Sequence, residues 1–266
     1  MDKRFPLQRV IFDLHGVLID RTATPFETTI SAGILTSLRD AGVKIGFVTN
    51  SSSLGSEEVS ALLQSHSIKV YPDEIVTAGL AMAAYIERYF SGSRIYLIGK
   101  EDLRKLIERV CLNMVRWTSG DQADVVVVGR DPDLTEEKLE GAATASRRNA
   151  VLLATSRDRS FPANGGYHPG PGYTVDRVES AMGVRAYVVG KPNPFALTEM
   201  FGLSRSDLKN TLIVGDSFDP DVLFGMNAGA ATALLCESAE PMTIKEYSER
   251  NWILYQLEQI LQLVGR

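Results

Sequence analysis

The polar residues that could carry out chemistry follow apolar segments that are typical of buried strands. Asp13 lies in the first such segment, and the second ends in Thr49 and is followed by Asn50 and Ser51. A later segment is followed by Lys191. Because ligands of α/β sheets bind at the carboxyl ends of parallel strands, we expect these side chains to meet at one sheet edge. A lysine beside a loop of hydroxyl and amide groups can bind the oxygens of a phosphate.

A cluster of acidic residues follows another of these segments, Thr211 to Val214, and contains Asp216 and Asp221. Carboxylates from different strands can hold one Mg²⁺, a hard cation that prefers oxygen ligands and is often shared with a phosphate. One carboxylate can also attack phosphorus and form an aspartyl-phosphate. A metal is needed there because carboxylate and phosphate repel each other. The order and spacing of these groups therefore favour metal-assisted phosphoryl transfer.

Short apolar runs, most of them rich in valine, isoleucine and leucine, recur along the whole chain. Nearly continuous hydrophobicity of this kind is typical of strands buried on both faces of a parallel sheet. The predicted strands are Val10 to Leu14, Lys44 to Thr49, Arg94 to Ile98, Asp124 to Val128, Val151 to Thr155, Ala186 to Val189, Thr211 to Val214 and Thr232 to Leu235. Helical spacing occurs at Thr28 to Ala41, Glu57 to Gln64, Ala81 to Phe90, Glu101 to Leu112, Thr135 to Arg148 and Trp252 to Val264. The alternation predicts an α/β fold with crossover connections.

Three local patterns predict where elements end. Thr135 is expected to cap the helix that follows it, because its hydroxyl can accept a main-chain N–H. Asp219 is either an acidic group that supports the site residues or the cap of a helix that begins at Pro220, and the cap is favoured because proline suits the first helical position. The segment 164–172 contains four glycines and two prolines. We expect it to be a hinge, a domain crossing or a long surface loop rather than a helix or a central strand.

The composition excludes several other classes of protein. A chain of 266 residues that is 44% hydrophobic and 23% charged is typical of a globular protein with one large or two smaller domains. The formal net charge is −5 and there is no run of lysine and arginine, so no nucleic-acid partner is expected. No apolar stretch approaches the roughly 18 residues of a membrane span, and the first residues lack the features of a signal peptide. We therefore expect a cytoplasmic protein without membrane contact.

Four segments resemble, in order, the motifs of the haloacid dehalogenase-like superfamily. The segments that match the first to the fourth motif are Phe12 to Leu18, Val48 to Asn50, Gly190 to Pro194 and Val214 to Asp221. Three stretches resemble more closely the type IIA branch, which includes p-nitrophenyl phosphatase-like and N-acetylglucosamine-phosphatase-like proteins: Gly46 to Ser52, His168 to Gly172 and Asp221 to Gly229. The resemblance covers essentially the whole chain.

The resemblance implies a Rossmann-like, doubly wound parallel sheet core with an inserted α/β cap domain. The core would comprise residues 1–78 and 183–266, and the cap would comprise residues 79–182. It also implies a Mg²⁺-dependent phosphatase that hydrolyses a small phosphorylated metabolite through an aspartyl-phosphate. A homodimer formed through the cap is a further implication.

The resemblance also implies a role for each polar group. Asp13 would be the nucleophile. The Mg²⁺ ligands would be Asp13, Asp216, Asp221 and the main-chain carbonyl of His15. The residues that would bind the transferring phosphoryl group are Thr49, Asn50, Ser51 and Lys191. Of these, Lys191 would also neutralise charge between Asp13 and that group.

His15 departs from the pattern of the superfamily's phosphatases, which carry a second aspartate two residues after the nucleophile as the general acid and base. His15 could take over this work, since imidazole can donate and accept a proton near neutral pH. Alternatively, its presence leaves a catalytically impaired protein that binds phosphate esters as a sensor or regulator. The third alternative is different chemistry, or an engineered substitution. Dehalogenation is disfavoured, because dehalogenases of the superfamily use no Mg²⁺, whereas this chain retains the acidic residues Asp216 and Asp221 that would bind it.

Three further polar residues have less specific interpretations. His66 is expected at the surface, and His168 is expected to be structural or solvent-exposed, although it could approach a substrate. Arg157 follows a predicted strand, in a segment that faces the active site in the family. It could pair with an acidic group of the substrate or be an ordinary surface arginine.

Overall fold

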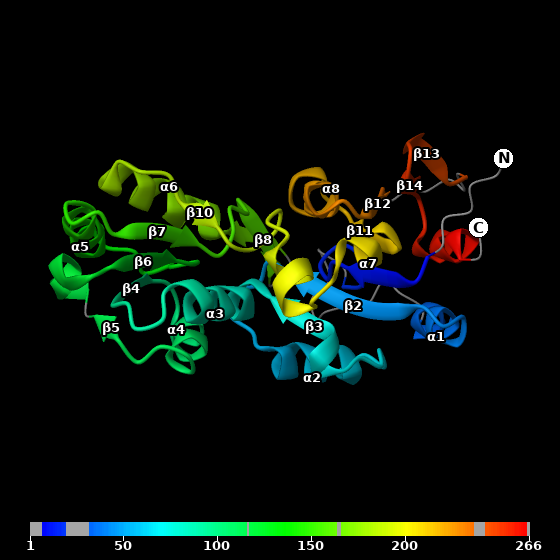
Figure 1. Cartoon of the computed structure of the whole chain (residues 1–266), viewed down its shortest axis with the longest axis horizontal. Coiled ribbons are helices and arrows are strands. Elements are labelled where there is room, and N and C mark those ends of the chain that lie inside the picture. The colour runs from blue at the N-terminus through cyan, green and yellow to red at the C-terminus, as the bar shows by residue number, and fades with distance from the viewer. Residues whose placement is uncertain (1–6, 20–31, 116, 164–165, 237–242, 265–266) are drawn as a thin grey trace.

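The computed structural model describes residues 7–19, 32–115, 117–163, 166–236 and 243–264. Two sheets lie toward opposite ends of the long axis, with helices on their faces (Figure 1). The larger sheet has the order β13-β14-β12-β11-β1-β2-β3, and the smaller has the order β10-β7-β6-β4-β5. Within these two sheets, all neighbouring strands are parallel except β13 and β14. The predicted α/β class with parallel sheets is therefore confirmed.

The elements have the following bounds. The seven-stranded sheet contains β1 (Arg9–Phe12), β2 (Lys44–Thr49), β3 (Ile75–Thr77), β11 (Thr211–Gly215), β12 (Ala231–Leu235), β13 (Lys245–Ser248) and β14 (Asn251–Leu254). The five-stranded sheet contains β4 (Ile95–Ile98), β5 (Met114–Val115), β6 (Val125–Val128), β7 (Val151–Ala154) and β10 (Tyr187–Val188). A separate pair consists of β8 (Ser160–Ala163) and β9 (Gly166–Pro169). The α-helices are α1 (Ala32–Asp40), α2 (Ser56–Ser65), α3 (Ala78–Tyr89), α4 (Glu101–Glu108), α5 (Glu136–Ser146), α6 (Pro171–Met182), α7 (Arg205–Lys209) and α8 (Leu223–Ala228). Shorter helical segments span Pro72–Glu74, Trp117–Gln122, Ala196–Met200, Phe218–Val222 and Leu257–Leu263.

Strand β1, in the interior of the larger sheet, is apolar from Val10 to Phe12 because helices cover both faces. Val10 and Phe12 of β1 lie in one buried cluster together with Leu38 of α1. Ile11, which points to the opposite face, lies in a second cluster with Phe224 of α8. Successive strand residues face opposite sides of a sheet, so the three buried positions 10–12 of β1 must all be apolar, whereas Arg9 at its start is only half-buried.

The smaller sheet is also covered on both faces. On one face, Leu97 and Val127 share a cluster with Met82 of α3 and Leu103 of α4. On the other face, the cluster combines Val126 and Val128 with Leu139 of α5 and Val175 of α6. The first of these clusters also contains Ile11, so apolar packing continues from one sheet to the other. Within the described residues, no helix combines the length and apolarity needed to cross a membrane.

The sheets divide the chain in nearly the same way as the predicted domains do. The larger sheet takes its strands from residues 9–77 and 211–254, and the smaller sheet takes its strands from residues 95–188. Strand β10 pairs with β7 of the smaller sheet although it lies beyond residue 182. The domain bounds 1–78, 79–182 and 183–266 stay a prediction.

The predicted C-terminal helix over Trp252 to Val264 is wrong in its first half. Trp252 and Leu254 lie in β14, which pairs in parallel with β12. These two residues are buried while their neighbours Asn251 and Ile253 are half-buried. Apolar residues at positions 252, 254 and 257 are compatible with a strand followed by a helix. The strand forms because β12 has an edge with which residues 251–254 can pair. A 3₁₀ helix spans only Leu257–Leu263.

The glycine- and proline-rich segment is also more ordered than predicted. Gly166–Pro169 forms strand β9 against β8, and Pro171 begins α6, where its missing N–H costs nothing. Prolines are tolerated in β8 and β9 because these two strands form a sheet of their own, so each has an edge at which no main-chain N–H is needed. Gly170 is required by close packing, since a Cβ at this position would lie 2.1 Å from the carbonyl oxygen of Asp158. Residues 164–165 lie outside the described part of the chain.

Of the two predicted helix caps, one is confirmed and one is wrong. The hydroxyl of Thr135 accepts the N–H of Lys138 at the start of α5. Asp219 is not a cap, because the helical segment Phe218–Val222 begins two residues earlier than predicted and is preceded by Ser217. Asp219 lies in the first turn, where a carboxylate favours the positive end of the helix dipole.

Two buried threonines are expected to respond oppositely to replacement by valine. Thr77 Oγ1 accepts the N–H of Leu80 at the start of α3. Thr155 is fully buried, and its Oγ1 has no hydrogen-bond partner among the described residues. Thr77→Val should lower the free energy of unfolding by about 1 kcal/mol through the lost cap. Thr155→Val should leave it unchanged or raise it, since an unpaired buried hydroxyl is replaced by a methyl group. Urea denaturation measures both, and an equal loss in the two variants would contradict the prediction.

Candidate active site

Asp13 and Asp216 follow adjacent strands at the topological switch point of the larger sheet. Strands β1 and β11 pair in parallel, with Phe12 opposite Val214. The chain continues from β1 to β2 on one side and from β11 to β12 on the other. Where connections diverge in this way, they leave a crevice at the carboxyl ends of the strands. The topology therefore brings together two of the predicted metal ligands.

A tight turn after Asp13 determines the position of His15. The carbonyl oxygen of Leu14 accepts the N–H groups of Leu18 and Ile19, both at 2.9 Å. Gly16 has a φ of +82°, a conformation that glycine adopts without strain. Its N–H donates to the carbonyl of Ile19, and His15 forms a bridge with the same residue. His15 lines the same cavity as Asp13.

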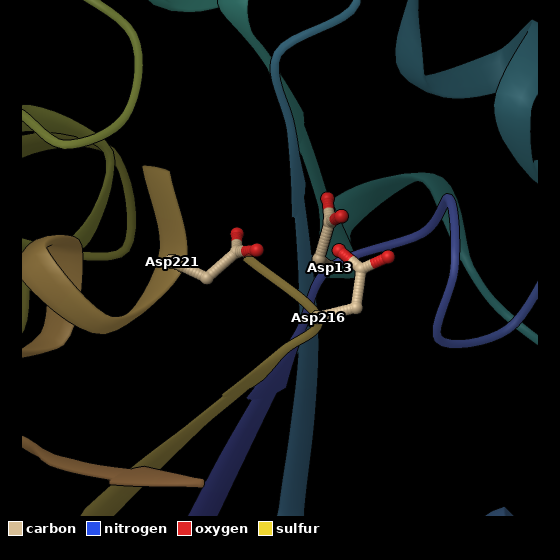
Figure 2. Close-up of side chains that lie close together, drawn as sticks. All are labelled: Asp13, Asp216 and Asp221. Carbon is tan, nitrogen blue, oxygen red and sulfur yellow. The ribbon is translucent and has the colours of Figure 1, made fainter. Parts of the chain in front are cut away.

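Three carboxylates converge at this edge of the sheet. Asp13, Asp216 and Asp221 each offer an oxygen, and the three oxygens lie within 4.8 Å of one another. Figure 2 shows Asp13 and Asp216 at neighbouring strand ends, with Asp221 pointing toward them from the opposite side. The main-chain N–H of Ser217 donates to Asp221 Oδ2 at 3.1 Å, and the hydroxyl of Ser217 donates to Asp216 Oδ1 at 3.2 Å.

Lys191 provides positive charge to this cluster. Its Nζ lies 2.6 Å from Asp13 Oδ1 and 2.6 Å from Asp221 Oδ1. The exposed fraction is 4% for Lys191 and 2% for Asp221. Burial acts against the charge of Lys191, but Asp13 and Asp221 outweigh it and raise the pKa of the amine above its usual value. Burial also raises the pKa of Asp221 to about 6, opposed by Lys191 and reinforced by Asp13.

The residues that follow β2 lie beside Lys191. Thr49 is buried, and its Oγ1 accepts the N–H of Ser51 at 3.3 Å. The side chain of Asn50 binds the main chain of Lys191 on both sides: its Oδ1 accepts the N–H at 2.9 Å and its Nδ2 donates to the carbonyl at 3.3 Å. The amide of Asn50 therefore holds Lys191, a contact that the sequence did not predict.

Asp158 is a site residue that the sequence analysis missed. Its Oδ1 accepts a hydrogen bond from Asn50 Nδ2 at 3.1 Å, which joins the segment after β7 to the segment after β2. Burial raises the pKa of Asp158, and the charge of Lys191 opposes this shift. The only sequence signal was its place directly after a predicted strand, in the segment already noted for Arg157.

A cavity of about 560 Å³ contains the predicted site residues Asp13, His15, Thr49, Asn50, Ser51, Lys191 and Asp221 in its lining. Residues that follow the strands of the smaller sheet line the same cavity, among them Lys100, Arg130 and Asp158. The carboxyl ends of both sheets therefore face one shared cavity. Its size is within the range of small-molecule binding sites.

The remaining polar candidates lie at or beyond the border of this cavity. Arg157 lines it, but its guanidinium pairs with Asp176 and Glu179. His168 is half-buried against Phe161, at 5.8 Å between ring centroids, and is not among the lining residues. His66 lies at the end of α2, with Nδ1 2.9 Å from the carbonyl oxygen of Leu62. It is not part of the cavity lining either.

The fold and site define an α/β protein with carboxylates and a buried lysine at the switch point of a parallel sheet, opposite a second sheet.

Residues 10–112 match the family model described as haloacid dehalogenase-like hydrolase, and residues 188–249 match a HAD-hydrolase-like model. The chain is similar to the 5'-nucleotidase YutF of Bacillus subtilis, with 32% identity over 83% of this chain and 86% of that protein. It is also similar to the acid sugar phosphatase of Staphylococcus haemolyticus, with 31% identity over 82% of this chain and 83% of that protein.

Among solved structures, the p-nitrophenyl phosphatase from Archaeoglobus fulgidus has a TM-score of 0.78 and 27% identity, over 96% of this chain and 98% of that one. The chain belongs to the haloacid dehalogenase-like hydrolase family. The predicted family, its fold and the predicted enzyme class, a phosphatase-type hydrolase of this family, are confirmed.

The donor groups of the site suit a magnesium ion. Mg²⁺ prefers oxygen ligands and uses few carboxylates from the protein, and three carboxylates lie within reach of one position. Lys191 binds two of them from one side. The individual roles predicted for Asp13, His15, Asp216 and Asp221 stay predictions.

Proposed function

We propose that the chain is a Mg²⁺-dependent phosphatase that hydrolyses a small phosphorylated metabolite through an aspartyl-phosphate on Asp13, with residues 79–182 as a cap over the site. The observation that carries this proposal is the convergence of Asp13, Asp216, Asp221 and Lys191, three of which (Asp13, Asp221 and Lys191) line one cavity that residues of both sheets share. The phosphatase names of the relatives support it. The homodimer through the cap stays a prediction.

The proposed mechanism begins with charge neutralisation around Asp13. When bound by Asp13, Asp216, Asp221 and the carbonyl of His15, Mg²⁺ would offset the negative charge of the substrate's phosphate. Lys191, held by Asn50, offsets charge between Asp13 and the phosphoryl group. Thr49, Asn50 and Ser51 lie at the end of β2, where they bind the phosphoryl oxygens.

The two chemical steps exchange bonds at phosphorus. A carboxylate oxygen of Asp13 forms a bond to phosphorus, and the bond from phosphorus to the ester oxygen breaks. The leaving oxygen takes a proton from the imidazole of His15. Water then attacks phosphorus, returns a proton to His15 and releases inorganic phosphate and the carboxylate of Asp13.

The second candidate function is a catalytically impaired protein that binds phosphate esters. The observation that favours it is the identity of His15, which lines the cavity in place of the family's second aspartate. Both functions use the same cavity, so only turnover separates them.

The test measures phosphate release in the presence of Mg²⁺ from a panel of small phosphate esters. We expect the wild type and His15→Asp to turn over, and His15→Gln to be slower by roughly 10²- to 10⁴-fold, since glutamine cannot transfer the proton. If only His15→Asp turns over, the binding protein becomes the supported function. Full activity of His15→Gln would exclude His15 from proton transfer.

A further inference from the structure

The smaller sheet has a topological switch point of its own, and it faces the same cavity. Strands β4 and β6 are neighbours, with Ile98 opposite Val128. From β4 the chain continues to β5 on one side, and from β6 to β7 on the other. Helix α4, between β4 and β5, packs on one face, and α5, between β6 and β7, packs on the opposite face. This divergence produces a crevice at the carboxyl ends of β4 and β6.

Two cations stand at this second switch point. Lys100 lies two residues after Ile98, and Arg130 lies two residues after Val128, so the strand register places them side by side. Both residues line the cavity that contains Asp13. The mechanism proposed above uses neither of them.

The guanidinium of Arg130 is positioned by two contacts, neither of which is with a carboxylate. Its Nε donates to the carbonyl of Pro169 at 3.2 Å, and its central carbon lies 4.5 Å from the ring centroid of Phe161. Within the described part of the chain, its two terminal nitrogens have no hydrogen-bond or ion-pair partner. A guanidinium stacked on an aromatic ring keeps the fork of donors that binds oxyanions in bidentate fashion.

The other arginines of the cavity differ in that carboxylates of the protein already pair with them. Arg157 contacts Asp176 and Glu179, and Arg159 contacts Asp176. Among the residues that the structure describes, Lys100 has only a long contact of 3.7 Å with Asp102, and both of these side chains are exposed. The positive charge available to a ligand at this end is therefore that of Arg130, with Lys100 beside it.

We propose that the substrate is a phosphate monoester that carries a second oxyanion, which Arg130 and Lys100 bind at the end of the cavity formed by β4 and β6. This inference rests on the proposed function, which places the scissile phosphate beside Asp13. A cavity of about 560 Å³ leaves room beyond that phosphate for the rest of such a molecule. Either a carboxylate or a second phosphate can serve as this oxyanion, since both present oxygens that accept hydrogen bonds from a guanidinium.

The test compares matched pairs of esters with and without the second anion. The carboxylate pair is 3-phosphoglycerate and glycerol 3-phosphate, and the phosphate pair is fructose 1,6-bisphosphate and fructose 6-phosphate. We expect kcat/KM of the wild type to favour, in at least one pair, the ester with the second oxyanion by roughly ten- to hundredfold, the usual value of a charge-assisted pair of hydrogen bonds. The pair with the larger ratio identifies the oxyanion. Equal values within both pairs would overturn the inference.

Variants of the arginines assign the preference to a residue. Arg130→Gln should remove most of the preference for the ester with the second oxyanion. It should change kcat/KM for glycerol 3-phosphate, which lacks that oxyanion, less than about threefold. Arg130→Lys, which keeps the charge but not the fork, should retain part of the preference. Arg159→Gln is the matched control, since this arginine lines the same cavity but pairs with Asp176, and it should keep the preference. Loss of the preference in Arg159→Gln but not in Arg130→Gln would contradict the assignment.

Binding experiments separate this inference from the proposed function. Calorimetry of 3-phosphoglycerate and glycerol 3-phosphate, and of the two fructose phosphates, is carried out on Asp13→Asn and on Asp13→Asn with Arg130→Gln. Tighter binding of an ester with the second oxyanion, where it depends on Arg130, supports the inference even if the wild type releases no phosphate. If the wild type turns over but shows no such dependence in either measurement, the inference fails and the proposed function stands.

Discussion

Asp13→Asn is expected to lower the rate of Mg²⁺-dependent phosphate release by at least about 10⁴-fold, the scale of loss seen when a catalytic nucleophile is removed. Asparagine has nearly the same shape, and its carbonyl oxygen can still accept a hydrogen bond from Lys191 Nζ, which lies 2.6 Å from the present carboxylate. It cannot form an acyl phosphate, however, and it removes one charge from the metal site. Initial rates of phosphate release from the best ester of the panel measure the effect.

Asp219→Asn provides the matched control for this loss. Asp219 lines the same cavity but is not one of the three carboxylates that converge. We expect its replacement to change the rate by less than about tenfold. A rate in Asp13→Asn within tenfold of the wild type would exclude Asp13 as the nucleophile and, with it, the aspartyl-phosphate.

Lys191→Met is expected to destabilise the protein strongly as well as inactivate it. Lys191 is 4% exposed and pairs with two carboxylates, so its removal leaves Asp13 and Asp221 close together without a counter-charge. Breaking a buried ion pair by removing one partner typically costs about 3 to 5 kcal/mol. Urea denaturation in the presence of a chelator should show a loss of this size in the free energy of unfolding.

Magnesium should restore part of the stability lost in Lys191→Met, because a cation that binds only the folded carboxylates shifts the folding equilibrium. Lys100→Met is the matched control, since Lys100 lines the same cavity, is exposed and has only a 3.7 Å contact with Asp102. It should change the free energy of unfolding by less than about 1 kcal/mol. Equal stability of Lys191→Met and the wild type would contradict the role of Lys191 as the counter-ion of the cluster.

Much of the fold and of the site followed from local patterns. The continuous apolar runs predicted the central strands, because a strand covered on both faces must be apolar at every position. Asp13, Asn50, Lys191 and Asp216 could be expected to converge because each follows such a run and the carboxyl ends of parallel strands share one edge. The cap of α5 by Thr135 was also readable, since it depends on residues three positions apart.

Tertiary structure decided the features that depend on distant contacts. The C-terminal series of apolar residues forms β14 because β12 offers a free edge to it, and no local pattern carries that information. Gly170 and Gly172 serve close packing against the segment after β7, a need that only the assembled chain reveals.

The finer arrangement of the site depends on the same kind of contact. Asn50 lies 141 positions from Lys191 and 108 from Asp158, yet its amide joins both. Arg157 and Arg130 look alike in the sequence, and only the carboxylates folded against Arg157 distinguish a paired charge from an available one. The sequence determined which groups stand at strand ends, because that depends on local periodicity. The packing of the two sheets decided which groups are paired and which remain available to a substrate, because those contacts exist only once the chain is folded.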